Sequence, residues 1–158
     1  MYPSGVNLKH AHTTLSHDVV GTWQLMSRED RTLDGGVRVD PGLGADPIAL
    51  LIYDRNGNFA AQFMKRDRSR DSPADSDSAG SNNSRARGGY DAYFGKYTVD
   101  DADGTVTQRL DGALSPENVG LVLTRTMQVR NGELTIQLET TAGDGERIIR
   151  TLRWRRVA

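Results

Sequence analysis

The sequence predicts an all-β protein built as one antiparallel, up-and-down barrel of about eight strands. Short runs of alternating apolar and polar side chains follow one another from Val19 onward, as is typical of half-buried strands. Turn signals separate these runs, and no stretch repeats apolar residues at the spacing of a long helix. Strands joined by such short links form a meander, and closing the meander into a barrel removes its exposed edges.

The turn signals also set the expected strand boundaries. Asn56-Gly57 and Asn131-Gly132 are hairpin signals, because a two-residue type I′ turn needs positive φ at both central residues. The sequences at 101–104 and 115–118 are expected to form two longer connections. The expected strands are 20–29, 48–54, 58–65, 92–100, 105–114, 121–130, 133–141 and 147–156.

The chain of 158 residues suits a single domain with one core. We expect a polar tail over residues 1–18 and the barrel over residues 19–158. Within the barrel, residues 66–91 are rich in Ser, Asp, Arg and Gly, which predicts a mobile loop at one mouth. An insertion without a function is the alternative for this segment. The absence of cysteine excludes a disulfide scaffold, a zinc finger and a thiol nucleophile.

Charge and hydropathy narrow the class of partner. Twenty Lys and Arg against 21 Asp and Glu give a net charge of −1, which argues against a nucleic-acid partner. The longest apolar run, Ile48–Tyr53, is too short to span a membrane. Residues 1–18 contain no apolar stretch of the kind found in signal peptides, so we expect a cytoplasmic protein. Both a monomer and a homodimer are compatible with the sequence.

Alternation assigns side chains to the lumen or to the outer face. Three polar residues, Gln108, Arg125 and Arg150, fall in register with apolar neighbours that face inward. The predicted turns place Arg125 opposite Leu138 and Tyr97 opposite Gln108, whereas Tyr53 falls out of register with Ala61. The residues expected to line a ligand site are Tyr93, Tyr97, Gln108, Leu110, Arg125, Met127, Leu138 and Arg150.

Arg125 is the most informative member of this set. An unpaired charge in a lumen of low dielectric constant is costly, so this guanidinium needs a partner. The partner is either a ligand carboxylate, enolate or carbonyl, or an internal group such as a tyrosine hydroxyl, a backbone carbonyl, water or a carboxylate. The sequence leaves both interpretations open.

A second pair is expected at one end of the barrel. Alternation places Trp23 and Ser27 on one face of the first strand and Arg28 on the other. In a barrel with an even number of strands, the last strand runs antiparallel beside the first, which brings Trp23 close to Arg156. A guanidinium stacked on the indole would plug that end, so we interpret this pair as structural.

Familiar catalytic motifs are missing from the sequence. No nucleophile elbow, phosphate-binding loop or dinucleotide fingerprint is present, so no cofactor is predicted. The three histidines, His10, His12 and His17, lie in the polar tail, and we predict no functional metal site there.

Two functions fit these observations. The first is a binding protein that holds a small, largely apolar molecule in the lumen, with its polar end on Arg, Tyr and Gln side chains. The second is a cavity enzyme, an isomerase or cyclase that positions a hydrophobic biosynthetic intermediate. Since no histidine or carboxylate is expected in the lumen, binding is favoured.

Several segments resemble the lipocalin-like domain proteins of bacteria and fungi, a calycin-type family. The matching segments are GTWQLMS (21–27), LLIYDRNGNFAAQFM (50–64), AYFGKYTVD (92–100), LSPENVG (114–120) and LRWRR (152–156). The resemblance implies an eight-stranded barrel with one ligand cavity, but no particular chemistry. Members often carry a histidine where this chain has Gln108-Arg109, so any family activity that uses a histidine base there is not expected.

Overall fold

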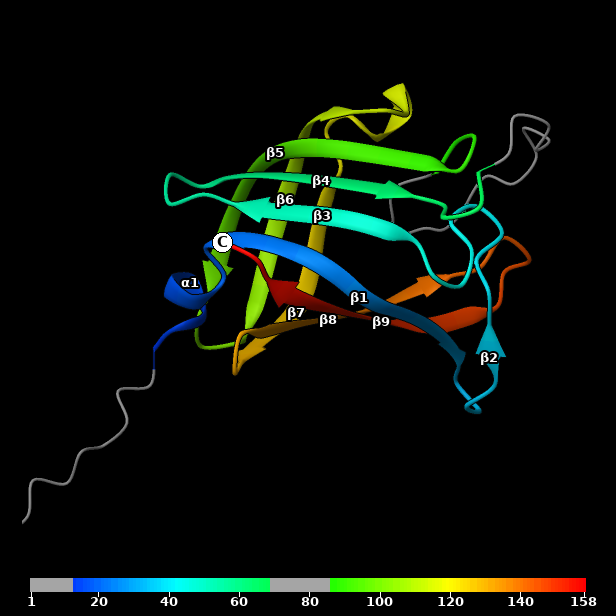
Figure 1. The fold of residues 1–158 in the computed structure, drawn as a ribbon, viewed down its shortest axis with the longest axis horizontal. Coiled ribbons are helices and arrows are strands. Elements are labelled where there is room, and N and C mark those ends of the chain that lie inside the picture. The colour runs from blue at the N-terminus through cyan, green and yellow to red at the C-terminus, as the bar shows by residue number, and fades with distance from the viewer. Residues whose placement is uncertain (1–12, 69–85) are drawn as a thin grey trace, which may run out of the picture.

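The computed structural model describes residues 13–68 and 86–158, and Figure 1 shows their arrangement. The described chain contains a short helix, α1 (Leu15–Asp18), and a single 3-10 turn, Pro116–Asn118. Its nine strands are β1 (Gly21–Thr32), β2 (Val37–Arg38), β3 (Ile48–Tyr53), β4 (Asn58–Met64), β5 (Tyr90–Asp100), β6 (Thr105–Ala113), β7 (Val122–Arg130), β8 (Glu133–Thr141) and β9 (Arg147–Arg156).

Eight of these strands close into an antiparallel barrel. The sheet order is β1-β3-β4-β5-β6-β7-β8-β9, and β9 pairs with β1 to complete the ring. The short strand β2 pairs with the end of β1 outside this ring. The predicted up-and-down barrel of about eight strands is therefore confirmed. No described helix is long and apolar enough to cross a membrane.

The two Asn-Gly hairpins differ in their turns. Asn131 and Gly132 have φ of 53° and 73°, and Arg130 pairs with Glu133, as expected for a two-residue turn. At the other hairpin only Gly57 has positive φ, and Tyr53 pairs with Phe59. The prediction of a two-residue turn there is wrong by one residue.

The side chain of Asp54 explains this longer turn. One of its carboxylate oxygens accepts hydrogen bonds from the backbone N–H of Asn56 and of Asn58, both at 2.8 Å. Such an Asx turn stabilises a loop of residues 55–57 in place of the tighter turn. The shift of one residue turns Tyr53 into the barrel, where it is almost completely buried.

A β-bulge in β1 changes which side chains face inward. Leu25 pairs with Trp154 and Ser27 with Arg153, so Met26 is an extra residue on β1. Before the bulge Trp23 is buried, and after it Arg28 and Asp30 are buried while Ser27 is exposed. The prediction that Ser27 faces inward and Arg28 outward is therefore wrong, because strict alternation does not survive an inserted residue.

Trp23 and Arg156 lie together at the end of the barrel that α1 covers. The Arg156 guanidinium lies 4.3 Å from the centroid of the Trp23 ring, and the indole N–H donates to the Val19 carbonyl at 2.9 Å. Gly21 leaves space for this arginine, since a Cβ there would lie 2.4 Å from Arg156 Nη1. The end of the predicted tail is thus structured, and Ser16 binds Asp101 through both its backbone N–H and its hydroxyl.

The opposite end carries the β2 hairpin and the connection to β3, which Figure 1 shows far from α1. The predicted loop at 66–91 also begins and ends there, and β5 starts within it, at Tyr90. Residues 69–85 of this predicted loop lie outside the described residues.

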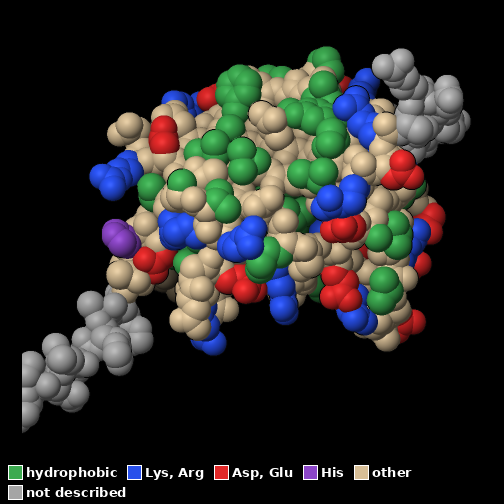
Figure 2. Space-filling model, in the orientation of Figure 1, with side chains coloured by type: hydrophobic (Ala, Val, Ile, Leu, Met, Phe, Trp, Pro, Cys, Tyr) green, Lys and Arg blue, Asp and Glu red, His purple; other side chains and the backbone are tan. Residues whose placement is uncertain are grey.

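The outer face of β3 to β5 is unusually apolar. Figure 2 shows hydrophobic side chains gathered over these strands, and Ile48, Leu50, Ile52 and Phe94 are among the exposed ones. Because both faces of β3 are apolar, composition does not identify its inner face. Its register with β4 makes that choice.

Truncating the buried indole tests the plugged end of the barrel. Trp23→Ala should lower the free energy of unfolding by about 3–5 kcal/mol, because it leaves a large cavity and removes the platform of Arg156. Urea denaturation followed by circular dichroism measures this loss. Leu33→Ala, at a side chain that is 61% exposed, is the control and should change stability little. Wild-type stability of Trp23→Ala would contradict the placement of Trp23.

Candidate functional site

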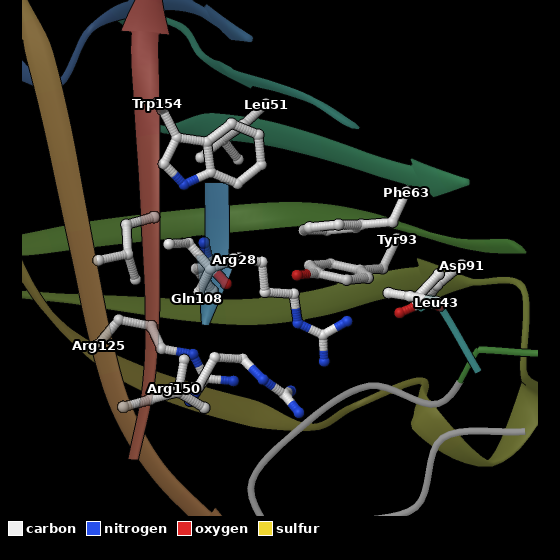
Figure 3. A pocket seen from close by; sticks show the side chains of 13 residues that line it. Arg28, Leu43, Leu51, Phe63, Asp91, Tyr93, Gln108, Arg125, Arg150 and Trp154 are labelled. Carbon is white, nitrogen blue, oxygen red and sulfur yellow. The ribbon is translucent and has the colours of Figure 1, made fainter. Parts of the chain in front are cut away.

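A cavity of about 50 Å³ lies inside the barrel (Figure 3). Its apolar wall is formed by aliphatic and aromatic side chains, and Phe63 and Tyr93 stack there with ring centroids 6.3 Å apart. The residues that line it are Arg28, Leu43, Leu51, Phe63, Asp91, Tyr93, Gln108, Arg125, Ile136, Leu138, Arg150, Leu152 and Trp154. The lumen is therefore mostly filled by side chains, with a small space at its polar end.

The cavity brings together five of the eight residues expected at a ligand site. Tyr93, Gln108, Arg125, Leu138 and Arg150 all line it.

The other three expected residues lie away from the cavity lining. Tyr97 pairs with Gln108 in the sheet, but its hydroxyl donates to the Asp54 carbonyl at 2.5 Å. Leu110 and Met127 are buried in the surrounding core.

Gln108 is held in place by Tyr53, a residue that the sequence did not assign to the site. The Gln108 amide donates to the Tyr53 hydroxyl at 2.5 Å. Tyr97 packs edge-on against the Tyr53 ring, with centroids 4.7 Å apart. Burial raises the pKa of Tyr53 far above its ordinary value, so the hydroxyl stays protonated. Gln108 is thus a fixed, neutral polar group on the cavity wall.

Three guanidinium groups converge at the polar end of the cavity. Figure 3 shows Arg28, Arg125 and Arg150 pointing into the same region, away from Leu51 and Trp154. Burial lowers the pKa of Arg28 and of Arg125, and the charge of Arg150 acts on both in the same direction. An arginine stays charged even so, so three positive charges meet at this end of the lumen.

Two buried aspartates bind these arginines. Asp30 accepts two hydrogen bonds from Arg150, at 2.8 and 2.9 Å, and Asp40 accepts one from Arg28 at 2.6 Å. Asp40 Oδ2 also lies 3.8 Å from Arg150 Nη2, and Asp30 Oδ2 lies 3.9 Å from Arg28 Nη2. These contacts join the four residues into one cluster.

The expectation of a lumen without carboxylates is wrong for a reason visible in the register. Asp30 pairs directly with Arg150 between β1 and β9. Its side chain faces inward because of the bulge at Met26, so predicting its position requires knowing that the bulge is there. Asp40 lies in the irregular connection before β3, where no periodic pattern exists to place it. Asp91, at the start of β5, is the carboxylate among the residues that line the cavity.

Two donors on the cavity wall have no hydrogen-bond acceptor among the described residues. They are Nη1 of Arg28 and Nε1 of Trp154, and both atoms are buried. Leaving such a donor without an acceptor costs about 1–3 kcal/mol. A wall with two of them is suited to an incoming acceptor group.

A family model described as a lipocalin-like domain matches residues 20–157, nearly all of the barrel. The chain belongs to the lipocalin-like domain family. Closed barrels of this type enclose a ligand cavity, in agreement with the lumen described above. A search of the curated proteins found no match, so the comparison gives this lipocalin-like protein a fold and a general ligand-binding character without a specific ligand.

Metal binding has no structural basis in the described part of this lipocalin-like barrel. Among residues 13–68 and 86–158, no group of three His, Cys, Asp or Glu side chains could hold a metal ion. His17 is largely exposed and contacts Asp18. His10 and His12 lie outside the described residues.

The ion cluster of the lipocalin-like barrel gives a clear stability test. Asp30→Asn should destabilise the protein by about 3–5 kcal/mol, because it leaves two buried arginines with one carboxylate. Glu139→Gln is the matched control, since the pair that Glu139 forms with Arg147 is solvent-exposed. That substitution should cost no more than about 1 kcal/mol. If both substitutions lower the free energy of unfolding by the same amount in urea denaturation, the cluster at Asp30 is not desolvated.

Proposed function

We propose that this lipocalin-like barrel binds a small, largely apolar molecule in its lumen and holds the polar end of that molecule with hydrogen-bond donors. The observation that supports this most directly is the pair of buried donors without an acceptor, on Arg28 and Trp154, at one cavity. Buried donors are normally satisfied, so a site that leaves two open is suited to a ligand acceptor.

The chemistry of the polar end limits what the ligand brings. A guanidinium and an indole N–H donate hydrogen bonds and accept none. The Gln108 amide is already committed to Tyr53. The ligand therefore presents a carbonyl, hydroxyl or carboxylate oxygen to these donors and an apolar body to Leu51 and Phe63.

The described lumen gives little support to a cavity enzyme. A general base must be free to take a proton, whereas two of the three buried aspartates, Asp30 and Asp40, are held by arginines. Burial raises the pKa of Tyr53, which disfavours the phenolate that an acid–base step would use. Binding therefore remains the function that the geometry supports best.

A retained or added ligand tests the proposal directly. Native mass spectrometry of the purified protein should show a small-molecule adduct, or one should form with octanoate, octanol or methyl octanoate. Trp154 lines the cavity and Trp23 does not, so a bound molecule should change the fluorescence of Trp154. In Trp23→Phe that signal should persist. If no adduct and no fluorescence change is found with any of these compounds, the proposal fails.

Removing one open donor should weaken binding without emptying the site. Trp154→Phe keeps an aromatic ring and deletes the indole N–H, so affinity should fall by about 0.5–1.5 kcal/mol, the net value of one neutral hydrogen bond. Isothermal titration calorimetry measures the change. Trp23→Phe is the control, because its N–H is already bonded to Val19 and lies outside the cavity. The same loss in both variants would mean that Trp154 Nε1 does not meet the ligand.

Arg125 provides a second test of the polar end. Arg125→Met nearly preserves length and removes the charge, so a ligand anchored there should lose about 1.5–3 kcal/mol of affinity. If Arg125 instead serves an internal network, the unliganded protein should itself lose stability while affinity changes little. Calorimetric titration and urea denaturation of the same variant distinguish these results.

A further inference from the structure

Residues 39–47, the connection between β2 and β3, lie at the end of the barrel opposite α1 (Figure 1). We call this stretch the covering segment. It contributes Leu43 to the cavity lining, and Leu43 is the one described lining residue that lies outside the barrel strands. The side chain is only 6% exposed, so it fills part of the lumen.

The covering segment is fastened by a carboxylate. Asp40 Oδ2 accepts the hydrogen bond from Arg28 Nη2 at 2.6 Å, and Oδ1 accepts one from the backbone N–H of Gly42 at 2.8 Å. The Asp40 carbonyl accepts from Gly44 N–H at 2.8 Å. The segment therefore enters the lumen as one compact turn, with its acidic group on an arginine and its apolar group in the cavity.

The barrel strands alone would leave a positive charge at this place. Arg28 and Arg150 line the cavity from the strands, and Asp30 is the strand carboxylate that contacts both of them. Asp40, from the covering segment, supplies the second carboxylate of this cluster. If the segment moves away, one arginine in excess remains in a buried, apolar-walled space.

The closed cavity is small for a ligand. About 50 Å³ is room for only a few water molecules, since one water needs roughly 10–15 Å³. The walls on β1 and β3 to β9 are tied into the closed sheet. Displacing Leu43 is therefore the change that enlarges the lumen without breaking the barrel.

We propose that the ligand is a small apolar carboxylic acid that takes the place of the covering segment. Its carboxylate replaces that of Asp40 on Arg28, and its hydrocarbon chain occupies the space of Leu43. Asp40 and Leu43 are thus an internal copy of the ligand, a carboxylate followed by an aliphatic group. This inference rests on the proposed ligand-binding function and assigns the ligand its chemical class.

Charge balance gives the site its selectivity. Exchange of one carboxylate for another keeps the buried cluster neutral, so an acid can displace Asp40 without leaving a charge unpaired. A neutral alcohol or ester that displaced Asp40 would leave Arg28 without its counter-charge. The lumen should therefore discriminate an acid from a neutral molecule of the same length.

Binding of octanoate, octanol and methyl octanoate to wild type and Asp40→Asn tests this exchange. Asp40→Asn removes the carboxylate that competes with octanoate for Arg28. Octanoate should therefore bind at least about tenfold more tightly, which corresponds to the loss of one charged hydrogen bond. Octanol and methyl octanoate bring no carboxylate to Arg28, so they should bind more weakly than octanoate in both proteins. Asp34→Asn is the matched control, because this substitution removes the same charge from the exposed β1–β2 turn. All three affinities should stay at the wild-type value in that control.

A second measurement keeps the wild-type charges and follows the segment itself. The chain has no cysteine, so Leu43→Cys carries a single thiol, buried at the cavity. Octanoate should accelerate labelling of this thiol by Ellman's reagent, because the ligand drives the segment out. Leu33→Cys, in the exposed turn, should label at a rate that octanoate does not change.

The outcomes separate this inference from the proposed function. If octanol binds wild type as tightly as octanoate, or octanoate slows labelling at position 43, the lumen binds ligands but the exchange is wrong. If none of the three compounds binds wild type or either variant, the proposed function and the exchange fail together. Should Asp40→Asn not fold, the labelling experiment alone decides the matter.

Discussion

The pairing of β1 with β9 is the interaction on which the rest of this structure depends. It closes the barrel, and it also decides which charged residues meet across the seam. At one end of the seam Trp23 lies opposite Arg156, and their contact seals the barrel beneath α1. Further along, Asp30 lies opposite Arg150, and this pair forms part of the buried cluster. One strand pairing thus builds both the closed end and the polar site.

The bulge at Met26 allows the closed end and the polar site to be built by the same strand. A regular strand that turns Trp23 inward would turn Arg28 and Asp30 outward, because the side-chain period of a strand is two. The extra residue shifts that phase, so an aromatic plug and a charged cluster face the same lumen. Buried ion pairs add little net stability compared with apolar packing, owing to their desolvation cost. Net stability therefore does not account for the polar end of the lumen, which is consistent with the proposed ligand recognition.

The two ends of the barrel are closed by different physical means. The α1 end is held by an indole, a stacked guanidinium and hydrogen bonds to backbone carbonyls, all tied to β1 and β9. The other end is covered by an irregular segment whose acidic residue fastens it to Arg28. A carboxylate on a guanidinium can be exchanged for another carboxylate, whereas a packed indole has no such substitute. The proposed exchange therefore places ligand access at the end that carries Asp40 and Leu43.

The sequence alone determined the number, order and approximate limits of the barrel strands, because alternation and turn residues are local signals. It also placed Gln108, Arg125 and Arg150 inward, since their strands are regular and their hairpins short. It could not assign Tyr53, Arg28 or Asp30, whose facing depends on a one-residue change in a turn or a bulge. Asp40 and Leu43 lie in a segment without periodicity, so only tertiary packing could bring them to the lumen. The fold follows from local patterns, whereas the charge balance of the cavity is a property of side chains that meet only once the barrel has closed.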